Sequence, residues 1–161
     1  MIIEINEELH EAKFNYYALR YANEQLEKRA KALRKENKDD SITLPLIGIY
    51  SSIVVQSDIE SIVDIMEFMF SPKQNAGVGR STIEEYLGSI QSEDEVDELK
   101  EEILSELEES GFFVKEIRQF NRTMSKLMES QEEMKNLTIE ETIELEQYKT
   151  LLERANDKEL I

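Results

Sequence analysis

The chain contains no cysteine and only one histidine among its 161 residues. Without cysteine it cannot form a disulfide bond, which fits a reducing compartment. A single histidine excludes a zinc site built on a histidine pair: His10 is followed by Glu11, but Phe14 stands where a zinc-protease motif requires the second histidine. No nucleophile can be matched with a histidine base and a third orienting group. The sequence therefore predicts no metal site, no cofactor and no enzyme.

Basic residues and long hydrophobic runs are also scarce. There are 19 Lys and Arg against 36 Asp and Glu, a net charge of −17. Such a field repels phosphates, so we expect no nucleic-acid binding. The longest apolar-rich run, 42–55, is interrupted by Pro45 and Gly48 and is shorter than the about 20 residues of a membrane span. No secretory signal pattern opens the chain. We expect a soluble cytoplasmic protein without a membrane partner.

The negative charge is concentrated between residues 93 and 109, where ten carboxylates face one basic residue, Lys100. Two interpretations of this segment stay open. It is either a solvated face of a helix or an electrostatic landing surface for a basic partner.

The first 36 residues change from one periodicity to another. Ile3 and Ile5 alternate with polar residues, whereas Phe14, Ala18 and Ala22 recur at helical spacing. This change predicts two short strands, a hairpin within residues 1–14, that lead into a helix from about Phe14 to Glu36.

Helical patterns separated by caps and breaks follow along the rest of the chain. The predicted helix starts are Pro45 in a first turn, Asp58 as an N-cap, and three capping boxes, Ser81 with Glu84, Ser92 with Glu95 and Thr138 with Glu141. Residues 71–80 read as a mobile surface loop, and Gly111 as a helix terminator.

The predicted fold is mainly α: a compact helical domain of about five to seven helices with a short N-terminal β-hairpin. We expect a domain over residues 1–130 and a C-terminal helical extension over 131–161.

Two apolar runs exceed what one helix face can bury, Phe68-Met69-Phe70 and Phe112-Phe113. Together with Phe120 on the following helix, they are the candidate partner-binding residues, as an exposed patch or groove for another apolar segment. Packing in the core is the simpler alternative. The neighbouring carboxylates Asp58, Glu60, Asp64 and Glu67 are explained more simply as helix caps and solvent-facing positions than as acid–base catalysts.

Several segments resemble the tail assembly chaperones of long-tailed bacteriophages that infect Gram-positive bacteria. The similar segments are the opening MIIEIN…KFNYYALRYANEQ, the helix pair from Leu46 to Met66, Thr82 to Leu87, and the acidic run from Asp94 to Glu109 followed by Gly111-Phe112-Phe113. The resemblance covers about residues 1–130. The chain departs from the family pattern at Glu7, where glycine often completes the hairpin turn, and at His10 and Ala12, where larger apolar residues are usual.

The resemblance implies a non-enzymatic protein of the host cell cytoplasm that is absent from the mature virion. It implies binding to the long helical tape measure protein, and recruitment of tail tube subunits around it. Members of the family are often made in two lengths by a ribosomal frameshift, and this chain resembles the shorter form or a single-length variant. Self-association stays open.

Two other functions are weighed against this one. The net charge also suits an acidic interaction module that mimics nucleic acid and inhibits a basic DNA-binding protein, although the basic run from Lys28 to Lys38 is unusual for a mimic. An unrecognised small enzyme built on carboxylates is the third alternative.

Overall fold

The computed structural model describes residues 1–36, 44–74, 77–132 and 136–161. In these ranges the chain forms seven helices and one two-stranded hairpin, which confirms the predicted mainly α fold. The strands are β1 (Ile2–Ile5) and β2 (Glu8–Glu11). The helices are α1 (Tyr16–Lys35), α2 (Leu46–Gln56), α3 (Ile59–Met69), α4 (Arg80–Ser89), α5 (Glu93–Glu108), α6 (Val114–Glu132) and α7 (Ile139–Asp157).

The hairpin forms despite the departure at its turn. β1 and β2 pair antiparallel with Ile5 opposite Glu8, so only Asn6 and Glu7 connect them. Both connecting residues have positive φ, 54° and 66°, as a type I′ turn requires. Ile3 and Ile5 are buried, and the terminal ammonium of Met1 donates to the carboxylate of Glu106 on α5. The hairpin is therefore fastened to the helical core.

The helices α3, α5 and α7 begin at the predicted capping residues. Asn15, Asp58, Ser92 and Thr138 each accept a hydrogen bond from a backbone N–H in the first turn of their helix, and Thr138 forms the full capping box. Such a cap contributes about 1 kcal/mol. Pro45 precedes α2 as its N-cap residue instead of lying in its first turn.

The predicted capping box at Ser81 is wrong. α4 begins two residues earlier than that box requires, at Arg80, with Gly79 as its N-cap residue and no side-chain cap. The guanidinium of Arg80 is bound by Asp64 and Glu67 on α3, which holds this helix start against the core. The predicted surface loop is also partly internal, because Ser71 and Val78 are buried; residues 75–76 of that loop lie outside the described residues.

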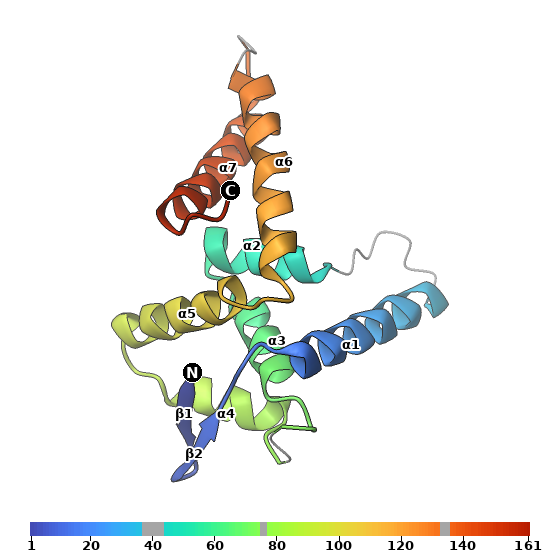
Figure 1. Cartoon of the computed structure of the whole chain (residues 1–161), viewed down its shortest axis with the longest axis vertical. Coiled ribbons are helices and arrows are strands. Elements are labelled where there is room, and N and C mark those ends of the chain that lie inside the picture. Colours follow the sequence, from blue (N-terminus) through green and yellow to red (C-terminus); the bar gives the residue numbers. More distant parts are fainter. Residues whose placement is uncertain (37–43, 75–76, 133–135) are drawn as a thin grey trace.

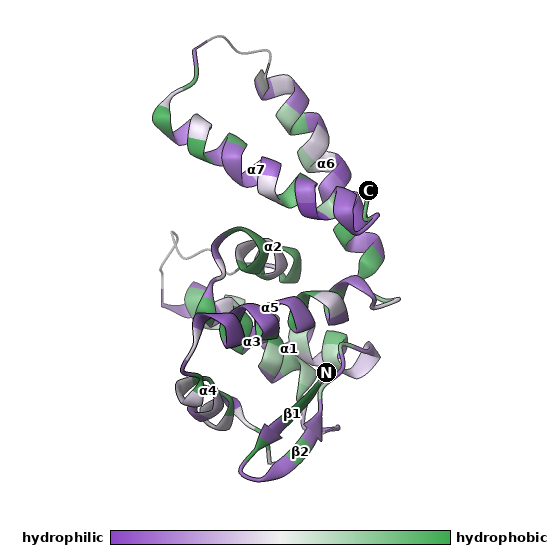
Figure 2. Cartoon of the chain, turned by 90° about the vertical axis from the view of Figure 1, so that its left-hand side faces the viewer, coloured by the Kyte–Doolittle hydropathy of each residue, from purple (hydrophilic) through white to green (hydrophobic). Residues whose placement is uncertain are grey.

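α3 is the centre of the molecule and contacts α1, α2, α4 and α5. Because several helices pack around it, most of its apolar side chains are buried, whereas Glu60, Asp64 and Glu67 lie along one polar side. α6 and α7 pack on each other and project from one end of the molecule, whereas the hairpin lies at the other (Figure 1). α2 is largely hydrophobic and α5 largely hydrophilic (Figure 2).

α7 ends in a Schellman motif. Glu159 has positive φ, Leu160 N donates to Ala155 O at 2.7 Å, and Leu160 is buried. Asn121 on α6 donates its side-chain N–H to Leu160 O, so the end of α7 is fixed to α6. The predicted division at residue 130 falls close to the end of α6, and it stays a prediction.

Candidate partner-binding surfaces

The six candidate partner-binding residues differ strongly in exposure. Phe68, Met69, Phe70 and Phe113 are buried in the core, and Phe120 is half-buried against it. Phe112 is 59% exposed. The first four are buried because α3 is surrounded by other helices and Phe113 points inward from the turn before α6. Of the six, Phe112 is the one that a partner can reach most fully without rearrangement.

Phe112 belongs to an exposed group of aromatic rings that we call the outer aromatic cluster: Tyr16, Tyr17 and Phe112. The ring of Tyr16 lies 5.8 Å from that of Tyr17 and 5.8 Å from that of Phe112, and all three side chains are exposed. These separations lie within the 4.5–7 Å typical of aromatic pairs. The start of α1 and the turn before α6, about a hundred residues apart in sequence, together build this surface.

A hollow of about 360 Å³ begins beside the cluster, between α1 and the segment that follows α3. Tyr17, Tyr21, Pro72 and Lys73 are among its lining residues. The ammonium of Lys73 lies 5.3 Å from the ring centre of Tyr17, a cation–π contact. The exposed rings therefore continue into a concave surface.

A second, more apolar hollow of about 450 Å³ lies between α1, α2 and α3. Leu26, Leu33, Leu44 and Ile49 give it an apolar lining, and Asp64 stands at its rim. We call it the α1–α3 groove. Its volume lies in the range of small-molecule pockets. Because the groove lies between helices, it suits a bound helix and a bound extended segment equally.

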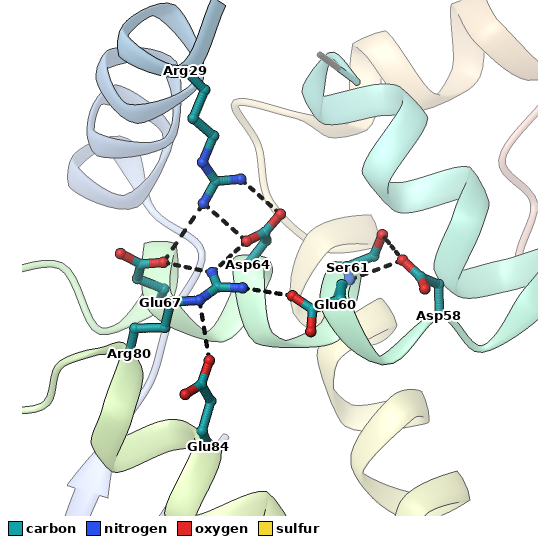
Figure 3. A network of polar contacts seen from close by, with 8 residues as sticks. All are labelled: Arg29, Asp58, Glu60, Ser61, Asp64, Glu67, Arg80 and Glu84. Carbon is teal, nitrogen blue, oxygen red and sulfur yellow. Dashed lines mark hydrogen bonds and ion pairs between the residues drawn. The ribbon is translucent and has the colours of Figure 1, made fainter. Parts of the chain in front are cut away.

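An ion-pair network borders this groove (Figure 3). Arg29 of α1 donates two hydrogen bonds to Asp64, at 2.8 and 2.9 Å, and Arg80 of α4 donates to the same carboxylate at 2.6 Å. Arg80 also donates to Glu67 at 3.1 Å and to Glu60 at 2.8 Å. The hydrogen bond with Asp64 raises the pKa of Arg29 above its ordinary value. The network ties α1 and α4 to the central helix.

This network also places the four carboxylates considered for catalysis. Asp58 caps α3, as predicted, and Glu60 is exposed. The side chains of Asp64 and Glu67 are only 14% and 19% exposed, because each lies against arginine guanidinium groups. The sequence did not indicate these ion pairs, because Arg29 and Arg80 lie 35 and 16 positions from Asp64 and Arg80 lay in a predicted loop.

A second polar cluster lies inside the molecule and joins α2, α5 and α7. Glu108 has a side chain only 5% exposed; Tyr50 donates its hydroxyl to it at 2.9 Å, and Arg154 binds it through two guanidinium nitrogens. Arg154 also donates to the exposed Glu101 at 2.9 Å. Burial opposes the charge of Arg154, but hydrogen bonds with its two carboxylate partners raise its pKa above the ordinary value. Burial and the nearby charge of Glu108 raise the pKa of Tyr50. We call these three residues the Tyr50–Glu108–Arg154 junction.

The remaining acidic residues of α5 are mostly exposed. Asp94, Glu98, Glu102 and Glu109 recur at spacings of four and seven along the side of α5 opposite its buried residues. We call this row the acidic face. It agrees with both interpretations of the acidic segment, a solvated face and a landing surface.

Within the described ranges, no helix is long and apolar enough to cross a membrane. In the same ranges, no group of three or more histidine, aspartate or glutamate side chains is arranged to hold a metal ion.

The described residues thus form a small helical protein whose distinctive surfaces are aromatic, apolar or charged, as in a protein that binds other proteins. Residues 2–122 match the family described as phage tail assembly chaperone protein, TAC. The chain belongs to this family, which confirms the resemblance and implies a non-enzymatic role. α7 and the last part of α6 lie beyond the matched residues. No curated protein and no solved structure matches the chain.

Proposed function

We propose that this tail assembly chaperone binds the tape measure protein of its phage and keeps it soluble, and that the outer aromatic cluster is the centre of the contact. The observation that carries the proposal is the exposure of Tyr16, Tyr17 and Phe112 as one continuous group of rings. Large aromatic side chains supply much contact area at a low entropic cost and dominate many binding interfaces.

A tape measure protein is a long helical chain whose apolar faces need cover until the tail tube surrounds them. The outer aromatic cluster and the neighbouring hollow at Tyr21 and Pro72 offer rings and a concave surface for such a face. The α1–α3 groove offers a second apolar surface farther along α1, at Leu26 and Leu33. The chain's net charge of −17 keeps the resulting complex soluble.

The same proposal includes the later steps of assembly. The bound chaperone helps to recruit tail tube subunits around the tape measure protein, acts in the cytoplasm of the host cell and leaves before the virion is complete. Phe68, Met69, Phe70 and Phe113 then support the binding surface from the core, against which Phe120 packs half-buried.

Co-expression with the tape measure protein of the same phage tests the proposal. The wild-type chain is expected to raise the soluble fraction of the tape measure protein and to co-elute with it. The Phe112→Ser variant is expected to lose most of this effect. Ile143→Ser is the matched control, because Ile143 is an equally exposed apolar side chain on α7, away from the cluster. Unchanged solubility with the wild-type chain contradicts the proposal.

The alternative function, inhibition of a basic protein through the acidic face, has a different signature. Exposed ion pairs are screened by salt, whereas apolar contacts are strengthened by many salts. A complex that dissociates at high salt and ignores Phe112→Ser, but is lost when Glu98 and Glu102 are changed to lysine, supports the alternative instead.

A further inference from the structure

One side of α6 carries a row of cations, in a chain that is strongly acidic. Its four residues recur at spacings of three and four, and all are exposed: Lys115, Arg118, Arg122 and Lys126. We call this row the basic stripe. At about 1.5 Å per residue it extends over roughly 16 Å along the helix. Ile117 and Asn121 are buried, so the stripe lies on the side of α6 that faces away from the core.

The cations of the basic stripe are not paired within their own chain. Other exposed cations of this protein do pair with carboxylates, for example Arg20 with Glu24. None of the four stripe residues forms a salt bridge with a carboxylate of the described ranges. The stripe is therefore a positively charged surface whose charges are available to a partner.

The basic stripe begins next to the outer aromatic cluster. Lys115 follows the exposed Phe112 by three residues, and Arg118 follows it by six. From this point α6 runs toward the end of the molecule that lies opposite the hairpin (Figure 1). A segment bound on the exposed rings can thus continue along α6, where it meets the four cations in succession.

From this continuity we infer that the basic stripe binds a row of carboxylates on the tape measure segment whose apolar face covers the outer aromatic cluster. The inference rests on the proposed function and adds the chemistry of the partner. The bound segment is an amphipathic helix in which apolar residues are followed by Asp or Glu at spacings of three and four. Side chains at these spacings lie on one side of a helix and match the spacing of the stripe.

The acidic remainder of the surface gives this contact a direction. Like charges that meet across an interface cost free energy, so the acidic end of a partner helix is repelled by the acidic face of α5 and attracted by the stripe. The charges therefore determine which end of the bound segment lies over α6. Nucleic acid is the less suitable partner, because its dense phosphates would meet the field of a chain with a charge of −17 around only four cations.

Calorimetric titration of the full-length chain with a soluble tape measure segment tests the contact. Two variants of the stripe are compared with the wild type: Arg118→Glu with Arg122→Glu, and the neutral Arg118→Gln with Arg122→Gln. At about 0.1 M salt the Glu variant is expected to bind at least about tenfold more weakly than the wild type, and the Gln variant is expected to lie between them. At about 1 M salt, where the Debye length falls from about 10 to about 3 Å, the three affinities are expected to converge.

Lys28→Glu with Lys35→Glu is the matched control. It makes the same change in net charge on exposed residues of α1. Each of them lies two positions from a leucine of the α1–α3 groove, Leu26 or Leu33, and therefore on the opposite side of the helix. The control is expected to keep the wild-type affinity. All the exchanged residues are exposed, so circular dichroism is expected to show unchanged folding for every variant.

Wild-type affinity of both stripe variants, in an experiment where Phe112→Ala weakens binding, overturns the inference and leaves the proposed function in place. An equal loss in the control also overturns it, because net charge then explains the effect, and so does a loss that persists undiminished at about 1 M salt. Retardation of RNA or duplex DNA by the wild type, lost in the Glu variant, assigns the stripe to nucleic acid and contradicts the inference. A wild-type chain that binds no tape measure segment contradicts the proposed function and the inference together.

Discussion

Two groups of aromatic rings lie side by side in this protein, one buried and one exposed. Residues 14–17 and 112–113 supply most of the rings in both groups. Phe14 and Phe113 point inward and form, with Tyr50, the inner aromatic cluster; their rings lie 5.8 and 6.3 Å from neighbours within it. Tyr16, Tyr17 and Phe112 point outward. Phe113 is completely buried, whereas Phe112, the residue before it, is 59% exposed.

The inner rings stabilise the fold, whereas the outer rings are exposed and available for binding. Tyr50 extends the inner cluster to the polar junction, because its ring contacts Phe113 and its hydroxyl binds Glu108. The inner cluster thus connects the segment before α1, α2 and the turn before α6 and, through Glu108 and Arg154, α5 and α7. Among the described residues, the ring contacts of the outer cluster join the start of α1 to the turn before α6, and Lys73 lies over the ring of Tyr17. Substitutions inside are expected to change stability, and substitutions outside are expected to change binding.

The largest expected effect is that of Phe113→Ala. Removing a fully buried phenylalanine side chain costs about 3–5 kcal/mol of unfolding free energy. The neighbouring Phe112→Ala is expected to change it by less than about 0.5 kcal/mol, since the side chain is exposed. Urea unfolding followed by circular dichroism measures both values. Equal losses for the two variants contradict the division into an inner and an outer cluster.

Arg154→Ala comes next, with an expected loss of about 3 kcal/mol. Glu108 then keeps a buried negative charge with only the Tyr50 hydroxyl to bind it. Replacing both partners, Glu108→Leu with Arg154→Met, is expected to cost less than Arg154→Ala alone, because no buried charge remains. Arg20→Ala, which breaks an exposed pair with Glu24, serves as the control and is expected to cost far less than Arg154→Ala.

Tyr50→Phe is expected to cost about 1 kcal/mol below pH 9, because it removes one hydrogen bond to Glu108. Burial and the charge of Glu108 raise the pKa of Tyr50 above the ordinary value of about 10. Above that pH the unfolded chain releases the proton while the folded chain retains it, so the wild type loses up to about 1.4 kcal/mol per pH unit. Unfolding curves from pH 8 to 11 are expected to show the gap between wild type and variant closing as pH rises. A constant gap contradicts this assignment.

The smallest effect on stability is expected for Tyr16→Ser. Its ring contacts only the two other outer rings among the aromatic contacts of the described residues, so the unfolding free energy should change by less than about 0.5 kcal/mol. The same variant is expected to bind the tape measure protein more weakly than Ile143→Ser does. A stability loss above about 1.5 kcal/mol shows that the outer cluster is part of the core.

Local signals in the sequence predicted much of the fold. The change of period before Phe14, the cap at Asp58 and the capping box at Thr138 all lie within a few residues of the structure that they specify. At the hairpin turn the local signal was missing, because Glu7 takes positive φ although it is not glycine. The hairpin is held by packing of Ile3 and Ile5 and by the Met1 ammonium, which are contacts distant in sequence.

The surfaces were less predictable because they depend on which elements meet. Phe68 to Phe70 looked too apolar for one helix face, and the sequence does not say which helices cover them; in the structure α3 contacts α1, α2, α4 and α5. Glu108 does carry a signal: it follows the buried Leu104 by four residues and therefore lies on the same side of α5. Its partner Arg154 is 46 positions away, and that pairing required the structure.

The affinity of the purified chain for a soluble segment of the tape measure protein tests the central claim most directly. Isothermal titration calorimetry on the wild type, Phe112→Ala and Ile143→Ser compares the outer aromatic cluster with an equally exposed apolar residue elsewhere. The account predicts at least about a tenfold weaker affinity for Phe112→Ala and no change for Ile143→Ser, with all three proteins equally stable. Binding by Phe112→Ala at the wild-type affinity would contradict the account.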